Sequence, residues 1–174
     1  SGQESDYEYQ ESDHYKEDVL NYCKQLAEIE ARKNKMIQIN KEATQKIVEA
    51  RKYIESSNSE LVENRMKIPQ LTSDLESLEV NIATLENETD KELFISRLIK
   101  VKQDIAFSEG LIKDIENEQL RKNKEIEDNT KLIQDNNIKL VDLENEYDSQ
   151  FNQCEVELKE MLALGEKLQD YFSD

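Results

Sequence analysis

The chain of 174 residues carries a net charge of −17, from 40 acidic and 23 basic residues, and 36% of its residues are hydrophobic. So large a negative charge disfavours binding to nucleic acid or to an anionic membrane surface, because Lys and Arg supply the attraction in both cases. Three Gly, one Pro and no Trp leave few residues for chain reversals, which argues against an ordinary globular domain and indicates long helices.

Residues 1–13 are acidic and show no apolar periodicity, with Tyr7 and Tyr9 as the only large side chains. Such a composition cannot bury enough apolar surface to offset the entropy of ordering. We therefore expect an acidic, disordered leader over residues 1–13.

The first predicted helix covers residues 14–85 and has a heptad pattern. From Tyr15 to Leu85, steps of four and three residues reach 21 sites, of which 17 are apolar or aromatic, against about eight expected from composition. A repeat sustained over this length is typical of a coiled-coil seam. Pro69 lacks an amide hydrogen, but the seam keeps its phase across it, so we expect a kink at Pro69 and not a loop.

The heptad phase breaks at residues 86–90, where we predict a turn, with Thr89 or Asp90 as the cap of the second helix. The second predicted helix covers residues 91–172. Its seam runs from Phe94 to Leu143 with 10 of 15 sites apolar, and a four-residue step from Tyr147 to Phe151 then indicates a stutter. Beyond that step the expected seam sites are Cys154, Leu158, Met161, Gly165, Leu168 and Phe172.

An antiparallel hairpin can be tested by pairing residues whose numbers sum to 176, because each a site should then face a d site. The pairing joins apolar to apolar and polar to polar residues: Ile82 with Phe94, Leu78 with Leu98, Asn40 with Asn136, and Ser57 with Gln119. It brings Cys23 near Cys154 but matches Ile54 poorly with Lys122.

We therefore predict an all-α fold, a long coiled coil that forms an antiparallel helical hairpin turning near residues 86–90. A straight parallel dimeric coiled coil remains an alternative, and a helical bundle is a third. A straight rod would span roughly 230 Å and a hairpin roughly 110 Å, at the rise of an α-helix.

The sequence lacks the residue patterns of a catalytic, cofactor-binding or metal site. Cys23, Cys154 and His14 are too few for a zinc site or a disulfide framework, and there is no glycine-rich phosphate loop. We expect no enzymatic activity, no cofactor and no metal, and a reducing compartment, cytoplasmic or nuclear. No run of 18 apolar residues occurs, so no membrane insertion is expected.

Aromatic residues near both ends of the coil are the candidates for docking partner proteins, because aromatic side chains are enriched at binding hot spots. They are Tyr15, Tyr22, Tyr147, Phe151, Tyr171 and Phe172. Four polar seam residues are candidates for setting the register of the coil, namely Asn40, Asn64, Asn129 and Asn136.

The expected function is that of a structural scaffold or assembly subunit, which forms a homodimer or hetero-oligomer through its coiled coil and docks protein partners. The abundance of Asn, Ile, Lys and Glu suggests a eukaryote, and the frequency of such coils there favours chromosome segregation or cytoskeletal assemblies. Two alternatives are the coiled-coil arm of a larger ATPase or motor, and a tether in membrane trafficking or autophagy.

Overall fold

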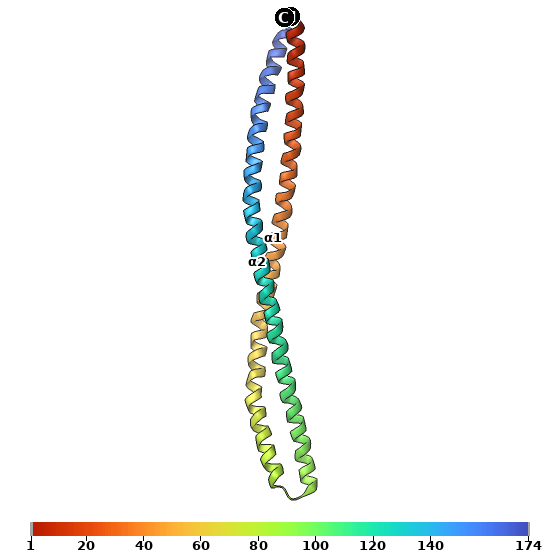
Figure 1. Ribbon diagram of the computed structural model, residues 1–174, viewed down its shortest axis with the longest axis vertical. Helices are drawn as coiled ribbons and strands as arrows, with labels where there is room; N and C mark the ends of the chain where they lie inside the picture. Colours follow the sequence, from red (N-terminus) through yellow and green to blue (C-terminus); the bar gives the residue numbers. More distant parts are fainter. Residues whose placement is uncertain (1, 174) are drawn as a thin grey trace. The chain divides into compact units, whose positions relative to one another are not determined.

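The computed structural model describes the backbone of residues 2–173, and the side chains of residues 7, 13–170 and 172. Two helices make up the fold (Figure 1): α1 spans Gly2–Thr84 and α2 spans Glu88–Ser173. They pack antiparallel as a helical hairpin, which confirms the predicted all-α fold and excludes the straight parallel rod.

The hairpin divides into two compact units. The terminal unit pairs α1 up to Ala43 with α2 from Lys131 onward, and the turn unit comprises residues 44–130. Each unit consists of one segment of α1 against one segment of α2, so each buries its apolar side chains along a single helix–helix contact.

The helix α1 includes residues 2–13, so the predicted disordered leader is helical in the structure. The stretch lacks apolar periodicity, but after Gly2 the sequence contains no Gly or Pro until Pro69. Because extending an existing helix costs far less than nucleating one, the helix set by the seam continues toward the N-terminus. The helix also runs through Pro69 without a loop.

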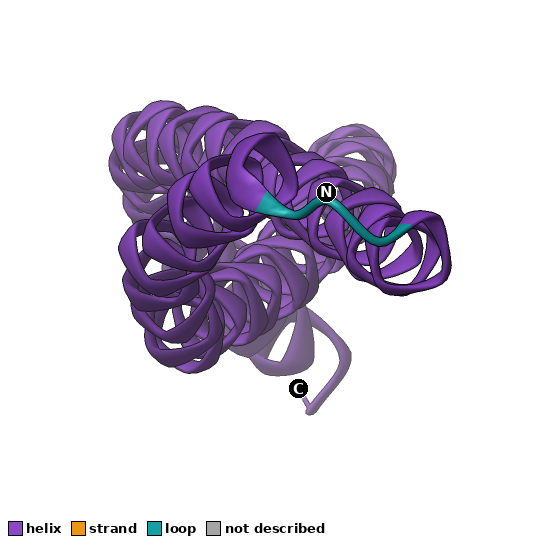
Figure 2. Ribbon diagram, turned by 90° about the horizontal axis from the view of Figure 1, so that it is seen from below, coloured by secondary structure: helices purple, strands orange, loops and turns teal. Residues whose placement is uncertain are grey.

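The turn between the helices is shorter than predicted and comprises residues 85–87, the teal connection in Figure 2. Asn87 caps α2, which corrects the expectation that Thr89 or Asp90 would do so. Its Oδ1 accepts hydrogen bonds from the backbone N of Thr89 at 2.9 Å and of Asp90 at 3.5 Å. Its carbonyl accepts from the amide of Lys91 at 3.0 Å, the first bond of the helix ladder.

The predicted seam is confirmed from Tyr15 to Leu85 and from Phe94 to Leu143, since every site in both runs is buried or half-buried. The buried apolar residues all lie on it or on its continuation: Ile29, Ala43, Ile47, Ala50, Leu61, Ile115, Leu143 and Leu168. The core is therefore a narrow line of side chains between two helices.

The predicted stutter after Tyr147 is wrong. The inward-facing residues keep the steps of three and four: Tyr147, Gln150, Cys154, Glu157, Met161, Leu164 and Leu168. Phe151 is 49% exposed and Leu158 is 38% exposed, so both lie outside the seam. The heptad repeat continues here without interruption, and as a result the polar residues Gln150 and Glu157 occupy seam positions between the helices.

Asn87→Ala should destabilise the hairpin by about 1 kcal/mol, because two backbone N–H groups at the start of α2 lose their acceptor. Urea unfolding followed by circular dichroism measures the change. The control is Asn117→Ala, an exposed site within α2, where the higher helix propensity of Ala should leave stability equal or slightly greater. Equal stability of the Asn87→Ala variant and the wild type would contradict the assigned cap.

Candidate functional site

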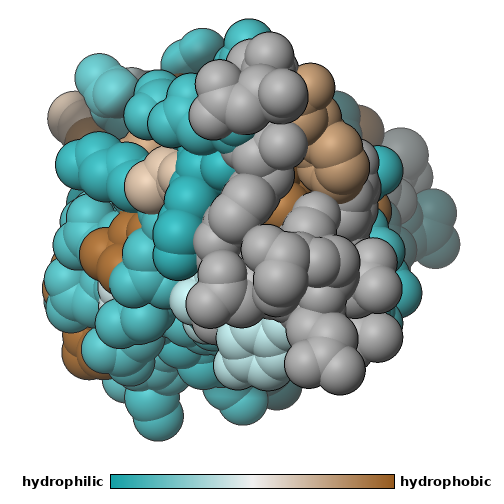
Figure 3. Space-filling model, turned by 90° about the horizontal axis from the view of Figure 1, so that it is seen from above, coloured by the Kyte–Doolittle hydropathy of each residue, from teal (hydrophilic) through white to brown (hydrophobic). Residues whose placement is uncertain are grey.

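The aromatic docking candidates all belong to the terminal unit. Tyr15, Tyr22 and Tyr147 are half-buried seam residues, whereas Phe151 and Phe172 are 49% and 62% exposed. The side chain of Tyr171 lies outside the described residues. Figure 3 looks onto the end of the molecule near the termini and shows apolar surface among the hydrophilic side chains there. Their role in docking partners stays a prediction.

Tyr147 is the centre of an aromatic and cationic contact between the helices. Its ring stacks on that of Phe151, with centroids 6.4 Å apart and an interplanar angle of 10°. From α1, the Nζ of Lys33 lies 5.7 Å from the Tyr147 ring centroid. Lys33 occupies a seam site, and its ammonium is accommodated there because the face of an aromatic ring attracts a cation.

Acidic and thiol groups gather in the seam around Glu157. Burial raises the pKa of the Glu157 carboxyl above its ordinary value of 4.5, and the neighbouring Asp18 carboxyl raises it further, against the opposing effect of His14. Its Oε2 is buried with no hydrogen-bond partner, as is Oε1 of Gln150. Burial also raises the pKa of Tyr22 above 10.0, with the charge of Glu157 adding to the shift.

The two cysteines meet across the helices, as the pairing of residue numbers predicts. Burial raises the pKa of the Cys154 thiol above 9.0, and the charge of the Cys23 thiolate and a hydrogen bond with Cys23 contribute. Both cysteines are free, with Cys23 exposed and Cys154 half-buried. A raised pKa keeps the Cys154 thiol protonated and weakly nucleophilic at neutral pH.

Two polar layers confirm the predicted register. Asn136 donates from Nδ2 to Oδ1 of Asn40 at 3.0 Å, and Gln119 donates from Nε2 to Oγ of Ser57 at 2.9 Å. Both pairs have numbers that sum to 176. Asn136 and Ser57 are buried, at 6% and 4% exposed, so the layers lie within the seam.

The other two register candidates behave differently. Asn64 donates to the carbonyl of Glu60 at 2.9 Å, and Asn129 donates to that of Glu125 at 2.8 Å, each within its own helix. Both face apolar residues in the predicted pairing, so the carbonyl four residues back is the nearest acceptor. A register-setting role for these two stays a prediction.

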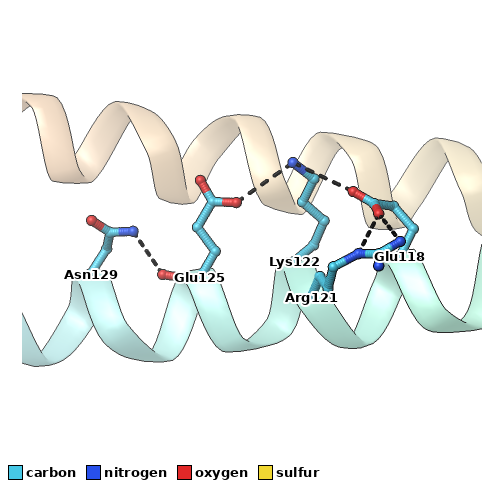
Figure 4. A network of polar contacts seen from close by, with 5 residues as sticks. All are labelled: Glu118, Arg121, Lys122, Glu125 and Asn129. Atoms are coloured by element: carbon cyan, nitrogen blue, oxygen red, sulfur yellow. Dashed lines mark hydrogen bonds and ion pairs between the residues drawn. The ribbon is translucent and has the colours of Figure 1, made fainter.

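Lys122, which matches Ile54 poorly in the predicted pairing, is held by charges on its own helix (Figure 4). Its Nζ lies 3.9 Å from Oε1 of Glu118 and 3.5 Å from Oε2 of Glu125. The ammonium also lies 5.8 Å from the ring centroid of Tyr53 on α1. These contacts turn the charge toward the edge of the seam, where water and carboxylates solvate it.

A groove in the turn unit was not anticipated from the sequence. It has a volume of 340 Å³ and is lined by Lys67, Gln70, Leu71, Asp104, Phe107 and Ser108. Phe107 is 68% exposed. Because this residue lies outside the seam, heptad spacing does not point to it, and the only signal was a large aromatic at an outward-facing position.

Over the described residues, no three His, Cys, Asp or Glu side chains gather in a way that could hold a metal ion. In the same part of the chain, neither helix is apolar enough over a sufficient length to cross a membrane.

No protein-family model matches the chain, and no curated protein matches it in sequence. Among solved structures, the chain is similar to the HP0958 protein from Helicobacter pylori CCUG 17874, with a TM-score of 0.62 and 14% sequence identity. The match covers 97% of this chain and 75% of that one. At this identity the likeness shows the fold alone, a coiled-coil hairpin.

Oxidation should link Cys23 to Cys154 within one chain, because the register places the two thiols near each other across the helices. With glutathione disulfide as the oxidant, the two thiols give up two protons and two electrons as their disulfide forms. One glutathione disulfide is thereby reduced to two molecules of glutathione. A mobility shift of the monomer on a non-reducing gel, absent from Cys154→Ser, measures the link. Exclusively intermolecular links would contradict the register at this end.

Glu157→Gln should raise the melting temperature at neutral pH, because it removes a buried carboxylate that lies beside Asp18. The folded-state pKa of Glu157 is raised, so the stabilisation from its protonation is fully present below pH 4.5 and is lost as the pH rises through that pKa. The difference between variant and wild type should therefore shrink as the pH falls, in thermal melts followed by circular dichroism.

Glu166→Gln is the control for this pH series, since Glu166 is exposed on the same helix. It should show no comparable rise in melting temperature at neutral pH. A Glu157→Gln variant that melts below the wild type at neutral pH would show that the carboxylate stabilises the fold.

Proposed function

We propose that this protein is a structural scaffold that connects partner proteins through its coiled-coil hairpin and has no catalytic activity. The observation that carries the proposal is the fold-back itself. It brings the N-terminal part of α1 and the C-terminal part of α2 into one unit, with the aromatic docking candidates on both. A surface assembled from two helices can hold a partner more firmly than either helix alone.

Charge and exposure indicate the kind of partner. A net charge of −17 favours protein partners over nucleic acid or anionic membrane. The exposed Phe151 and Phe172 supply apolar contact area of the type found at protein interfaces. A homodimer or a hetero-oligomer satisfies these features, and the two free thiols are consistent with a reducing compartment, cytoplasmic or nuclear.

A role in chromosome segregation or the cytoskeleton rests on how often such coils occur in those assemblies. The similar HP0958 fold comes from a bacterium and gives no support to a eukaryotic origin or to either process. The scaffold proposal therefore stands without a named assembly.

The hairpin favours one second candidate, the coiled-coil arm of a larger ATPase or motor. The chain enters through α1 and leaves through α2 in the same unit, as it would where an arm emerges from a globular domain. The full-length coding sequence distinguishes the two, since an arm requires globular ATPase segments on both sides.

The scaffold proposal is tested with the chain immobilised as bait in a lysate of its own cells. Phe151→Ala should lose bound proteins that Phe107→Ala retains, because both are exposed Phe residues of α2 and only Phe151 lies in the terminal unit. Quantitative mass spectrometry measures recovery. Recovery that is unchanged by Phe151→Ala, or no specific recovery, would count against docking at this unit.

A further inference from the structure

The two edges of the seam differ in the terminal unit. In an antiparallel pair, the e and b positions of both helices flank one edge, and the g and c positions flank the other. Contacts in the structure identify both edges. The e-position residues Arg65 and Glu116 form an ion pair at 2.6 Å, whereas the g-position residues Gln25, Arg32 and Glu146 line a common groove.

The e edge near the termini gathers apolar residues. Because the seam keeps its phase through Leu168, its e and b positions there are known. The apolar ones form what we name the apolar edge: Leu20, Cys23 and Ala27 of α1, with Phe151, Leu158 and Leu162 of α2. The charged residues Lys16, Glu30, Asp148 and Glu155 occupy e and b positions of the same edge. The opposite edge carries mainly polar residues: Asp18, Asn21, Gln25, Glu28, Glu146, Gln153, Val156 and Glu160.

The apolar edge is open to solvent. Leu20 is 61% exposed, Leu162 is 58% exposed and Phe151 is 49% exposed. From Phe151 to Leu162 the stripe extends about 16 Å along α2, which is about three helical turns. The seam beneath does not need these side chains, since Cys154, Met161 and Leu164 already fill it. A second apolar stripe of this kind is typical of a helix that contacts two neighbours.

The charges around the stripe select the neighbour. Between residues 146 and 170, α2 carries seven acidic and two basic residues, and residues 13–30 of α1 carry five acidic and two basic. Asp148, Glu155 and Glu166 lie next to the stripe, and an ion pair at 3.0 Å joins Glu155 to Lys159. A second copy of the chain would bring another net charge of −17, so charge favours a basic partner over a second copy at this edge.

We propose that the apolar edge binds an amphipathic helix of another protein, one whose apolar stripe is flanked by Lys or Arg. The inference rests on the proposed scaffold function and specifies its partner. The partner helix lies along α2 in the helix-in-groove mode, with its apolar residues against Phe151, Leu158 and Leu162. Its basic residues face the acidic positions beside them.

The probe is a fluorescent amphipathic peptide of about 18 residues, roughly 27 Å long as a helix, built from Leu and Lys alone. Its counterpart has every Lys replaced by Glu. Anisotropy titrations with the full chain at physiological ionic strength should show binding of the Leu/Lys peptide only. The Leu/Lys peptide should also slow the reaction of Cys23 with a maleimide, since that thiol lies on the edge.

The variants separate the apolar edge from general attraction to an acidic protein. Phe151→Gln/Leu162→Gln should weaken binding about tenfold or more, because two apolar side chains lose their burial. Val156→Gln is the matched control, 51% exposed on the same helix but on the opposite edge, and should change binding less than about twofold. Equal helicity by circular dichroism confirms that all three chains are folded.

Equal binding to the edge variant and to the control, or no binding of the Leu/Lys peptide, would overturn the inference. So would a concentration-dependent dimer, seen by light scattering, that Phe151→Gln/Leu162→Gln converts to monomer, since a second copy would then be the occupant. In each case the scaffold proposal survives if the immobilised chain still recovers proteins that Phe151→Ala loses. The scaffold proposal itself fails if the immobilised chain recovers no specific protein.

Discussion

The antiparallel contact between α1 and α2 along a single heptad seam is the constraint on which every other feature depends. Each helix presents one stripe of side chains to the other, and the buried residues lie along that stripe. Because no third layer covers the helices, stability is distributed over many small contacts rather than concentrated in a core. A single polar residue in the seam therefore removes only a small part of the total stability.

Polar layers interrupt the seam at two places. Asn136 donates a hydrogen bond to Asn40, and Gln119 donates one to Ser57, across the helices. Neighbouring residues take part as well, since Asn40 donates to Asn137 and Gln119 donates to Asn58. A polar group left without a partner in the interior costs more than such a bond contributes. A role of these layers in setting the register stays a prediction.

Two polar side chains of α2, Gln150 and Glu157, occupy seam positions in the terminal unit. Gln150 and Glu157 each bury an oxygen without a hydrogen bond, while Phe151, Leu158 and Leu162 remain outside. Polar groups inside and apolar groups outside weaken the hairpin at this place and at the same time leave surface for another chain. The proposed docking of a basic amphipathic helix and the polar seam positions have the same origin in the sequence of α2.

Heptad spacing alone predicted which residues face inward, in α1 and in the part of α2 that ends at Leu143. The matching of polar residues predicted the register. Both follow from the periodicity of the helix. Only the tertiary structure decided the cap by Asn87 and the path of the seam past Tyr147. Between residues 147 and 172 two heptad patterns overlap. One includes the polar residues Gln150 and Glu157, and the other includes the apolar residues Phe151 and Leu158. Sequence cannot choose between them, because the choice depends on the position of the facing helix, and that helix kept the uninterrupted heptad. For the same reason, the sequence could name the aromatic docking candidates but could not divide them into seam and surface residues. It also could not predict the groove beside Phe107.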